Sequence, residues 1–139
     1  MRHFVAVFFI TFFLLGCALD SRVPTNESGS YSTPHDSSQE AVFQKAKRAL
    51  MKEGFQVEVA NGSAGFLATA PKSMKLRPHQ ATCGKIWAIN YLSDYRTTTD
   101  VVINITVDAA TLTISSHING EYRVGKMDEV QPLACVSRG

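Results

Sequence analysis

The sequence has little excess charge and no long run of consecutive basic residues. Its 139 residues include 14 Lys and Arg against 12 Asp and Glu, which gives a formal net charge of +2. A domain that binds nucleic acid needs a concentrated basic surface to meet the phosphate charges. We therefore expect no nucleic-acid partner.

Motifs of catalysis and of metal binding are also missing. His35, His79 and His117 stand in no HExxH or other i,i+4 arrangement. Asp128 and Glu129 are adjacent in the sequence, which is typical of a solvated pair rather than of two carboxylates flanking a substrate. No Gly-x-Ser-x-Gly elbow or phosphate-binding loop occurs. We expect no catalytic residues, no metal site and no cofactor, and hence no enzyme.

The apolar run at the N-terminus is too short to span a membrane. It covers residues 4–15 and follows the basic start Met1-Arg2-His3. As a helix it would reach only about 18 Å at 1.5 Å per residue, whereas the hydrocarbon core of a bilayer is about 30 Å thick. A short apolar run after a basic start is typical of a signal peptide.

The end of this run, Leu14-Leu15-Gly16-Cys17, resembles the bacterial lipobox. The resemblance implies that Cys17 receives a diacylglycerol, that residues 1–16 are removed as a signal peptide, and that the new amino group is acylated. The lipid would then anchor the protein to a membrane. Ala18 stands where an Asp would favour retention in the inner membrane, so the resemblance implies the periplasmic face of the outer membrane. The alternative is an ordinary secretory signal with an incidental Cys17.

A polar segment follows the lipobox. Residues 18–37 are rich in Ser, Thr, Asn, Gly and Pro, so they offer little apolar surface to offset the entropy of ordering. We expect residues 17–37 to be the lipidated Cys and a flexible tether. The alternative is a partner-binding strand centred on Tyr31.

An amphipathic helix is predicted next. Ser37 and Glu40 fit a capping box, and Gly54 is a typical left-handed residue at a helix end. The apolar residues recur at helical spacing and form one face. They are Val42, Phe43, Ala46, Ala49 and Leu50. The cations Lys45, Lys47, Arg48 and Lys52 indicate either a solvated face or a site for anionic lipid or peptidoglycan.

Alternating apolar residues after Gly54 predict antiparallel strands. A hairpin is expected over residues 55–70, a long strand over 82–92, two further strands at 101–107 and 112–118, an edge strand at 121–124, and an irregular tail at 125–139. The fold class is then α+β, with one N-terminal amphipathic helix packed on an antiparallel sheet of five or six strands. Residues 38–139 would form this single domain.

Two cysteines remain beside Cys17. Cys83 and Cys135 would pair in an oxidising compartment, and closing a loop of about 53 residues would stabilise the fold by roughly 4 kcal/mol. The alternative is a reactive or metal-binding pair, although the 51 residues between them match no compact ligand spacing.

Two exposed segments are candidates for contact with a partner or a membrane. The loop 71–81 carries Lys72, Lys75 and Arg77 with apolar residues between them, although it could also be an ordinary solvated loop. Tyr122 lies in the predicted edge strand 121–124, where another chain could add a strand.

Residues 40–69 are similar to a pattern in small outer-membrane lipoproteins. The pattern reads Leu50-x-x-x-Gly54-Phe55-x-Val57, followed by Gly65-Phe66-Leu67-x-Thr69. It resembles the domains of the C-component lipoprotein of the outer-membrane β-barrel assembly machinery. The resemblance implies a helix packed on an antiparallel sheet, and fold alone does not determine function.

Two functional hypotheses follow. In the first, the protein is a structural or accessory lipoprotein of an envelope complex that serves barrel assembly, secretion or conjugation. In the second, it is a periplasmic module that binds a small apolar or lipid ligand between helix and sheet. The lining expected for that ligand is Phe43, Phe55, Trp87 and Tyr91, which could equally be core. A cavity would favour the second hypothesis, and a filled core with an exposed edge would favour the first.

Overall fold

The computed structural model describes residues 29–125 and 129–138. The predicted signal peptide, Cys17 and the first part of the predicted tether lie outside these residues. Most of the described chain forms strands. In chain order the elements are β1 (Gly29–Pro34), α2 (Gln39–Lys52), β2 (Val57–Asn61), β3 (Phe66–Thr69), β4 (Lys72–Ser73), β5 (Ala81–Thr82), β6 (Lys85–Ile86), β7 (Ile89–Asn90), the 3-10 helix η1 (Tyr91–Ser93), β8 (Thr97–Val107), β9 (Thr111–Val124) and β10 (Glu129–Ser137).

Strands β8 and β9 form a long antiparallel hairpin, which we call the central hairpin. Its register runs without a break from Thr97 opposite Tyr122 to Val107 opposite Leu112. Val, Ile and Thr dominate β8, and such β-branched residues favour a pleated, half-buried surface. The alternation correctly predicts strands at 101–107 and 112–118, but the separate edge strand expected at 121–124 is the continuation of β9.

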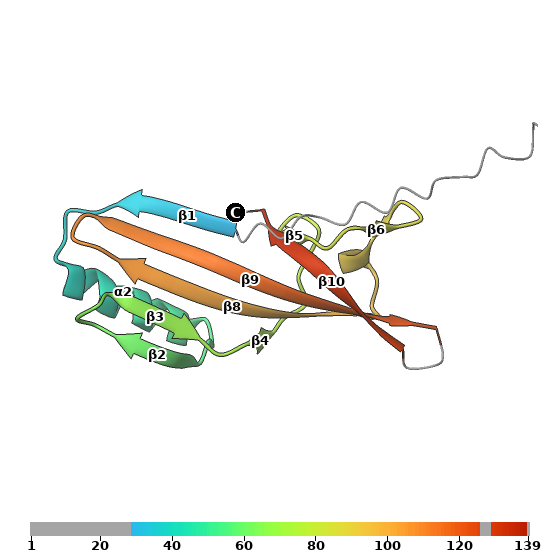
Figure 1. Ribbon diagram of the computed structural model, residues 1–139, viewed down its shortest axis with the longest axis horizontal. Helices are drawn as coiled ribbons and strands as arrows, with labels where there is room; N and C mark the ends of the chain where they lie inside the picture. Colours follow the sequence, from blue (N-terminus) through green and yellow to red (C-terminus); the bar gives the residue numbers. More distant parts are fainter. Residues whose placement is uncertain (1–28, 126–128, 139) are drawn as a thin grey trace, which may run out of the picture.

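Each edge of the central hairpin is shared by two shorter strands. Along β9, β1 pairs with residues 111–116 and β10 with residues 118–124. Along β8, β4 pairs with residues 100–101 and β3 with residues 104–106. With β2 beyond β3 and β5 beyond β10, eight strands form one antiparallel sheet, and β6 pairs only with β7. The molecule is elongated along the central hairpin (Figure 1).

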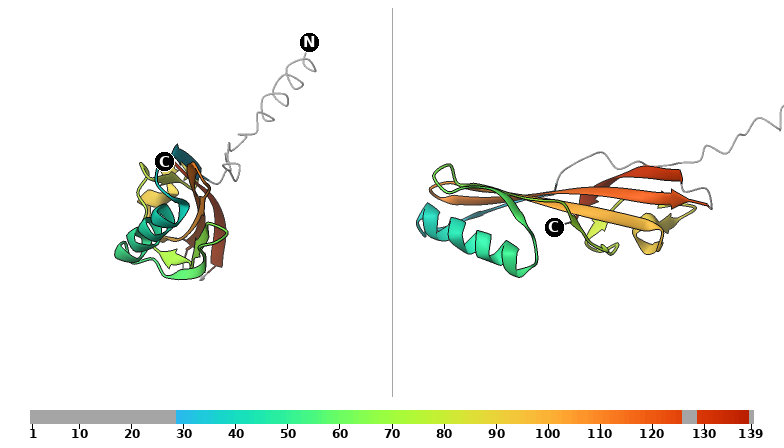
Figure 2. Two further views of the ribbon diagram at one scale, coloured as in Figure 1. Left: turned by 90° about the vertical axis from the view of Figure 1, so that its left-hand side faces the viewer. Right: turned by 90° about the horizontal axis from the view of Figure 1, so that it is seen from below.

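Different segments cover the two ends of the same sheet face. The odd-numbered residues of β8 point to this face, and most of them are buried. Helix α2 covers it where β8 ends, and the irregular segment 74–96 covers it where β8 begins (Figure 2). We call these the helix end and the disulfide end.

One apolar cluster runs along the covered face from end to end. At the helix end Phe43 and Leu50 of α2 are buried in it, together with Leu67 of β3. Its other buried members are Phe55, Leu76, Ala81, Cys83, Leu92, Val101, Ile105, Val107, Tyr122, Leu133 and Cys135. The core is therefore continuous although its cover changes.

Helix α2 forms where it is predicted, with a cap one residue later. The hydroxyl of Ser38, rather than Ser37, accepts a hydrogen bond from the Ala41 amide at 3.4 Å. At the other end Gly54 has a φ of +76°, and the Phe55 amide donates to the Leu50 carbonyl at 2.9 Å. This left-handed residue returns the chain to the sheet.

The expectation of an α+β fold with one helix on five or six strands is wrong. The sheet has eight strands, and the helix covers only one end of it, so the described chain is mostly β. Two of the additional strands come from segments that lack an apolar alternation. These are β1, from the end of the predicted tether, and β10, from the predicted irregular tail.

Backbone pairing explains both of these strands. β9 is 14 residues long, and its amide and carbonyl groups on the outer edge need partners. β1 supplies these partners for the first half of β9, and β10 supplies them for the second half. A hydroxyl contact of 2.9 Å also joins Ser32 of β1 to Thr113 of β9. The alternative of a strand around Tyr31 is thus realised, but on the chain's own sheet.

The predicted long strand at 82–92 is broken into three pieces. Gly84 has a φ of +87°, and Trp87 and Ala88 also have positive φ values, so the chain reverses between β6 and β7. η1 then follows, with the Asn90 side chain accepting from the Leu92 amide at 2.9 Å. Apolar residues on both faces of this stretch reflect a tight hairpin and not a central strand.

Gly65 and Gly125 allow a matched test of the packing. Both have a φ of +64°, but a Cβ on Gly65 would lie 2.0 Å from the Val107 carbonyl oxygen, whereas Gly125 has nothing within 4 Å. We expect Gly125→Ala to lose about 1 kcal/mol through the left-handed backbone alone. Gly65→Ala should lose clearly more free energy of unfolding, because the Val107 backbone cannot move away from the new Cβ. Urea unfolding measures both, and equal losses would contradict the packing of this turn on β8.

Candidate functional site

The basic loop 71–81 is used in part to hold the fold together. The Lys72 ammonium donates to the Glu53 carbonyl and lies 4.7 Å from the centre of the Phe55 ring. Lys75 also donates to backbone carbonyls, as described below, and Arg77 has an exposed side chain. Of the three predicted contact residues, two are occupied by structural interactions, so the loop is not a free basic patch.

The predicted partner contact at Tyr122 is wrong. Its side chain is only 3% exposed. The strand 121–124 is not an edge, because it pairs with β8 on one side and with β10 on the other. The tail that was predicted to be irregular supplies the strand β10, which covers this edge.

The aromatic residues expected to line a ligand site lie at opposite ends of the molecule. Phe43 and Phe55 are buried in the core at the helix end. Trp87 and Tyr91 belong to the segment that covers the disulfide end, and Trp87 is 83% exposed. An open depression of about 370 Å³ lies between α2 and β2, and Phe55 is the one member of the expected set that lines it. It is lined by Lys47, Met51, Phe55, Gln56, Val57, Glu58 and Ala60.

The disulfide predicted between Cys83 and Cys135 is confirmed. It ties the segment before β6 to the end of β10, and both cysteines are buried. Gly120 of β9 lies beneath it. A Cβ on Gly120 would stand 2.7 Å from the Cys135 sulfur, so the bond requires a glycine at this place in the central hairpin.

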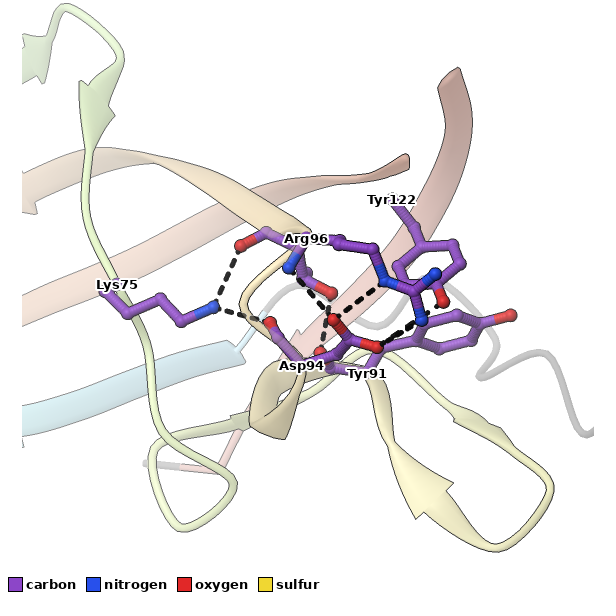
Figure 3. A network of polar contacts seen from close by, with 6 residues as sticks. Lys75, Tyr91, Asp94, Arg96 and Tyr122 are labelled. Atoms are coloured by element: carbon purple, nitrogen blue, oxygen red, sulfur yellow. Dashed lines mark hydrogen bonds and ion pairs between the residues drawn. The ribbon is translucent and has the colours of Figure 1, made fainter. Parts of the chain in front are cut away.

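A polar network holds the chain between η1 and β8 (Figure 3). The Asp94 carboxylate accepts from the Arg96 guanidinium through Nη2 at 2.7 Å and through Nε at 3.1 Å, and from the Arg96 amide at 2.9 Å. Lys75 donates to the carbonyls of Asp94 and Thr97, at 2.7 and 3.0 Å. Bidentate pairing of a planar guanidinium with a carboxylate gives this turn a defined geometry.

Three residues around this turn, Arg96, Tyr91 and Asp94, contact the side chain of Tyr122. The Arg96 guanidinium lies 4.8 Å from the centre of its ring, and the Tyr91 ring meets it edge-on at 4.9 Å. The Tyr122 hydroxyl donates to the Asp94 carboxylate at 3.4 Å. The segment before β8 therefore packs on β9 through aromatic and cation–π contacts as well as hydrogen bonds.

The network shifts the ionisation of its members in the directions expected for a structural ion pair. Hydrogen bonds from the Arg96 side chain, and then from its amide, lower the pKa of Asp94 from 3.8 to about 2. The same pair raises the pKa of Arg96, and burial raises the pKa of Tyr122. All three groups keep their usual charge at neutral pH, so none is prepared to exchange a proton there.

Residues 85–90, which directly precede η1 in the chain, form a short hairpin that we call the aromatic hairpin. Trp87 and Ala88 connect β6 to β7 as a two-residue turn, with φ values of +51° and +67°. Such turns favour Asn-Gly, because a residue with a Cβ loses about 1–2 kcal/mol in this conformation. Burial does not offset this conformational free-energy loss for Trp87, because its side chain is 83% exposed. Strain of this kind without local compensation is typical of functional sites.

Several other large apolar side chains are exposed at the disulfide end. Ile89 of β7 is 59% exposed, and Tyr95, in the turn before β8, is 88% exposed. Val124 and Val130, where β9 and β10 pair, are also exposed. Because several exposed apolar side chains accompany the strained turn at Trp87 and Ala88, we take this end as our candidate functional site.

Two other findings concern the described ranges 29–125 and 129–138. They hold no group of three or more His, Cys, Asp or Glu residues placed to bind a metal ion. No helix within them has the length and apolar character needed to cross a bilayer.

The sequence contains a weak signal for the aromatic hairpin that our interpretation missed. Gly84 and Asn90 bracket the apolar run from Ile86 to Ile89 at a spacing suited to a tight hairpin. The run itself matches a buried strand equally well, and the turn residues Trp87 and Ala88 are not usual ones. Local pattern alone therefore favoured the wrong structure.

Loss of the disulfide should loosen the aromatic hairpin's support more than the rest of the fold. For Cys83→Ala/Cys135→Ala, we expect about 4 kcal/mol less free energy of unfolding, because the bond closes a span of 52 residues. Trypsin should then cleave after Lys85 much faster than after Lys47 of α2. Unchanged relative cleavage at these two sites would contradict a local role for the bond.

The contribution of Asp94 to stability should depend on pH in one direction. Its pKa is lower in the folded protein than the ordinary 3.8, so its contribution is fully present above that value and is lost as pH falls through about 2. Asp94→Asn should therefore be less stable than the wild type at pH 6, with a difference that disappears near pH 2. Urea unfolding across this range measures it, and a difference independent of pH would contradict the ion pair.

Comparisons with known proteins give one distant structural similarity. No family model and no curated protein matches the sequence. Among solved structures, the fold is similar to that of a DUF4468 family protein from Bacteroides ovatus, with 12% sequence identity and a TM-score of 0.46. The match covers 79% of this chain and 64% of that one, so this chain spans less than two thirds of the other protein's length.

Proposed function

We propose that this chain is a lipoprotein anchored through Cys17 to the periplasmic face of the bacterial outer membrane, where it serves as a structural or accessory component of an envelope assembly. The observation that carries the proposal is the sequence Leu14-Leu15-Gly16-Cys17 at the end of a short apolar run. It supplies a thiol for lipid attachment and a small residue before the cleaved bond. Ala18 supports the outer membrane over the inner.

The disulfide supports an exported domain. A bond between Cys83 and Cys135 persists in an oxidising compartment such as the periplasm and is rare in the cytosol. The bond also ties the end of β10 to the segment before β6, so oxidation stabilises the fold. The disulfide in the fold is thus consistent with the proposed export to the periplasm.

The exposed apolar residues at the disulfide end support a docking role. A structural component needs a surface that stays unpaired in the isolated chain and is covered in the assembly. Tyr95, which is 88% exposed, is a residue type that contributes strongly to such contacts.

A second candidate function is the binding of a small apolar or lipid ligand. The observation that favours it is the depression between α2 and β2, whose apolar lining includes Met51, Phe55 and Val57. Its volume of about 370 Å³ lies at the lower end of the range for ligand sites. It is open to solvent, whereas the aromatic set first expected to line a site does not converge.

Labelling and affinity purification test the first function. The tagged full-length protein should incorporate an alkyne-bearing palmitate analogue, fractionate with outer membranes, and co-purify with stoichiometric amounts of an envelope complex from mild detergent. Cys17→Ser should abolish the label, because the other two cysteines are paired. It should also leave the signal sequence uncleaved at Gly16.

The outcomes separate the two candidates. An unmodified Cys17 in the N-terminal peptide would overturn the lipoprotein assignment. A lipidated protein that purifies alone, together with a bound lipid lost on Met51→Glu but not on Tyr95→Glu, would favour the ligand-binding role. Both variants change an exposed side chain, so neither should unfold the protein.

A further inference from the structure

The aromatic hairpin lacks a partner within the described chain. β6 and β7 pair only with each other, and their turn carries Trp87. The disulfide at Cys83 and the network around Asp94 bracket this hairpin and hold its base rigid. A small turn that exposes an indole and is held firmly at its base is suited to insert into a contact surface outside the domain.

The chain enters the domain beside the segment that leads to this hairpin. Gly29 packs so closely on Ser137 of β10 that a Cβ on Gly29 would meet the Ser137 Cβ at 2.5 Å. Ser137 pairs in turn with Ala81 of β5, two residues before Cys83. β1 then runs away from the disulfide end toward the helix end (Figure 1).

The length of the preceding chain limits how far the domain can move from a lipid at Cys17. Eleven residues, 18–28, separate Cys17 from Gly29. Fully extended, this connection reaches only about 40 Å at 3.3–3.6 Å per residue. Gly29 lies opposite Ser116, near the middle of β9, and this reach is long enough to let the disulfide end touch the bilayer.

The composition of the hairpin fits a lipid surface. Trp is enriched where the hydrocarbon of a bilayer meets its headgroups, because the indole has an apolar body and an N–H donor. Ile86 and Ile89 flank the turn, and Lys85 is the one charged residue in the range 83–93. A lysine beside the turn is attracted by anionic headgroups.

We propose that the aromatic hairpin inserts its turn into the headgroup region of the membrane that holds the lipid anchor, with Trp87 at the edge of the hydrocarbon. The occupant of this surface is the phospholipid bilayer itself. The inference rests on the proposed lipidation of Cys17. It adds a second point of contact, which orients the domain so that the helix end projects away from the membrane.

The protein contains a single tryptophan, so Trp87 reports its own environment. The lipidated full chain is reconstituted into vesicles of phosphatidylethanolamine and phosphatidylglycerol, with part of the phosphatidylethanolamine brominated on its acyl chains. Trp87 emission should shift to the blue, lose most of its intensity to the brominated lipid, and become several-fold less accessible to acrylamide in the water.

A reference tryptophan at the helix end controls for proximity. Val59 of β2 is 45% exposed, so Trp87→Phe/Val59→Trp moves the probe to the far end and leaves the fold intact. Its emission should stay red-shifted and unaffected by brominated lipid. Lys85→Glu should reduce the quenching of Trp87 in these anionic vesicles while Cys17 stays lipidated.

Each outcome decides the inference. If Trp87 remains as accessible to acrylamide as a free indole, or if both tryptophans are quenched alike, the proposed insertion is wrong. Shielding of Trp87 in native membranes but not in vesicles would overturn it in favour of a protein partner. A mass spectrum of the N-terminal peptide separates the two failures: an unmodified Cys17 refutes the proposed function, whereas lipidated protein with an exposed Trp87 refutes only the insertion.

Discussion

The backbone pairing of β8 with β9 is the interaction on which the rest of the structure depends. The two strands are 11 and 14 residues long, and each is too long for its outer edge to be covered by one of the short segments available. Unpaired amide and carbonyl groups must find partners, so each edge takes two strands in succession. This arrangement makes the molecule long and gives it two ends with separate covers.

The two ends differ in how order is achieved. At the helix end, α2 buries Phe43 and Leu50 against the sheet, and apolar burial is sufficient. The disulfide end has little regular structure between β4 and β8, and it is held by a covalent bond, an ion pair and the edge-on contact of Tyr91 with Tyr122. These specific contacts are short in range and directional, so they can support an exposed, strained turn that burial could not.

Elements with a strong local pattern were predictable from the sequence. The apolar face of α2, its end at Gly54, the hairpin of β2 and β3, and the alternation in β8 and β9 all follow from spacing and residue type. The pairing of Cys83 with Cys135 was predictable because, beside Cys17, the chain has only these two. Each of these signals lies in the residues themselves and needs no knowledge of the neighbours.

Other elements exist only because of their neighbours. β1 and the polar part of β10 carry no pattern of strands, and they form because β9 presents an unpaired edge. Tyr122 was predicted on an exposed edge, and it is buried because β10 covers that edge. The aromatic hairpin reverses at Trp87 and Ala88, since the disulfide and the Asp94 network fix the chain on either side. The sequence by itself thus determined the helix, the strands at 101–107 and 112–118, the cysteine pair and a lipobox-like N-terminus, because side-chain spacing is a local property. Only the tertiary structure decided the outer strands and the exposed surface. Backbone hydrogen bonds form with any side chain, so the outer strands depend on which unpaired strand edge lies close to them in the fold.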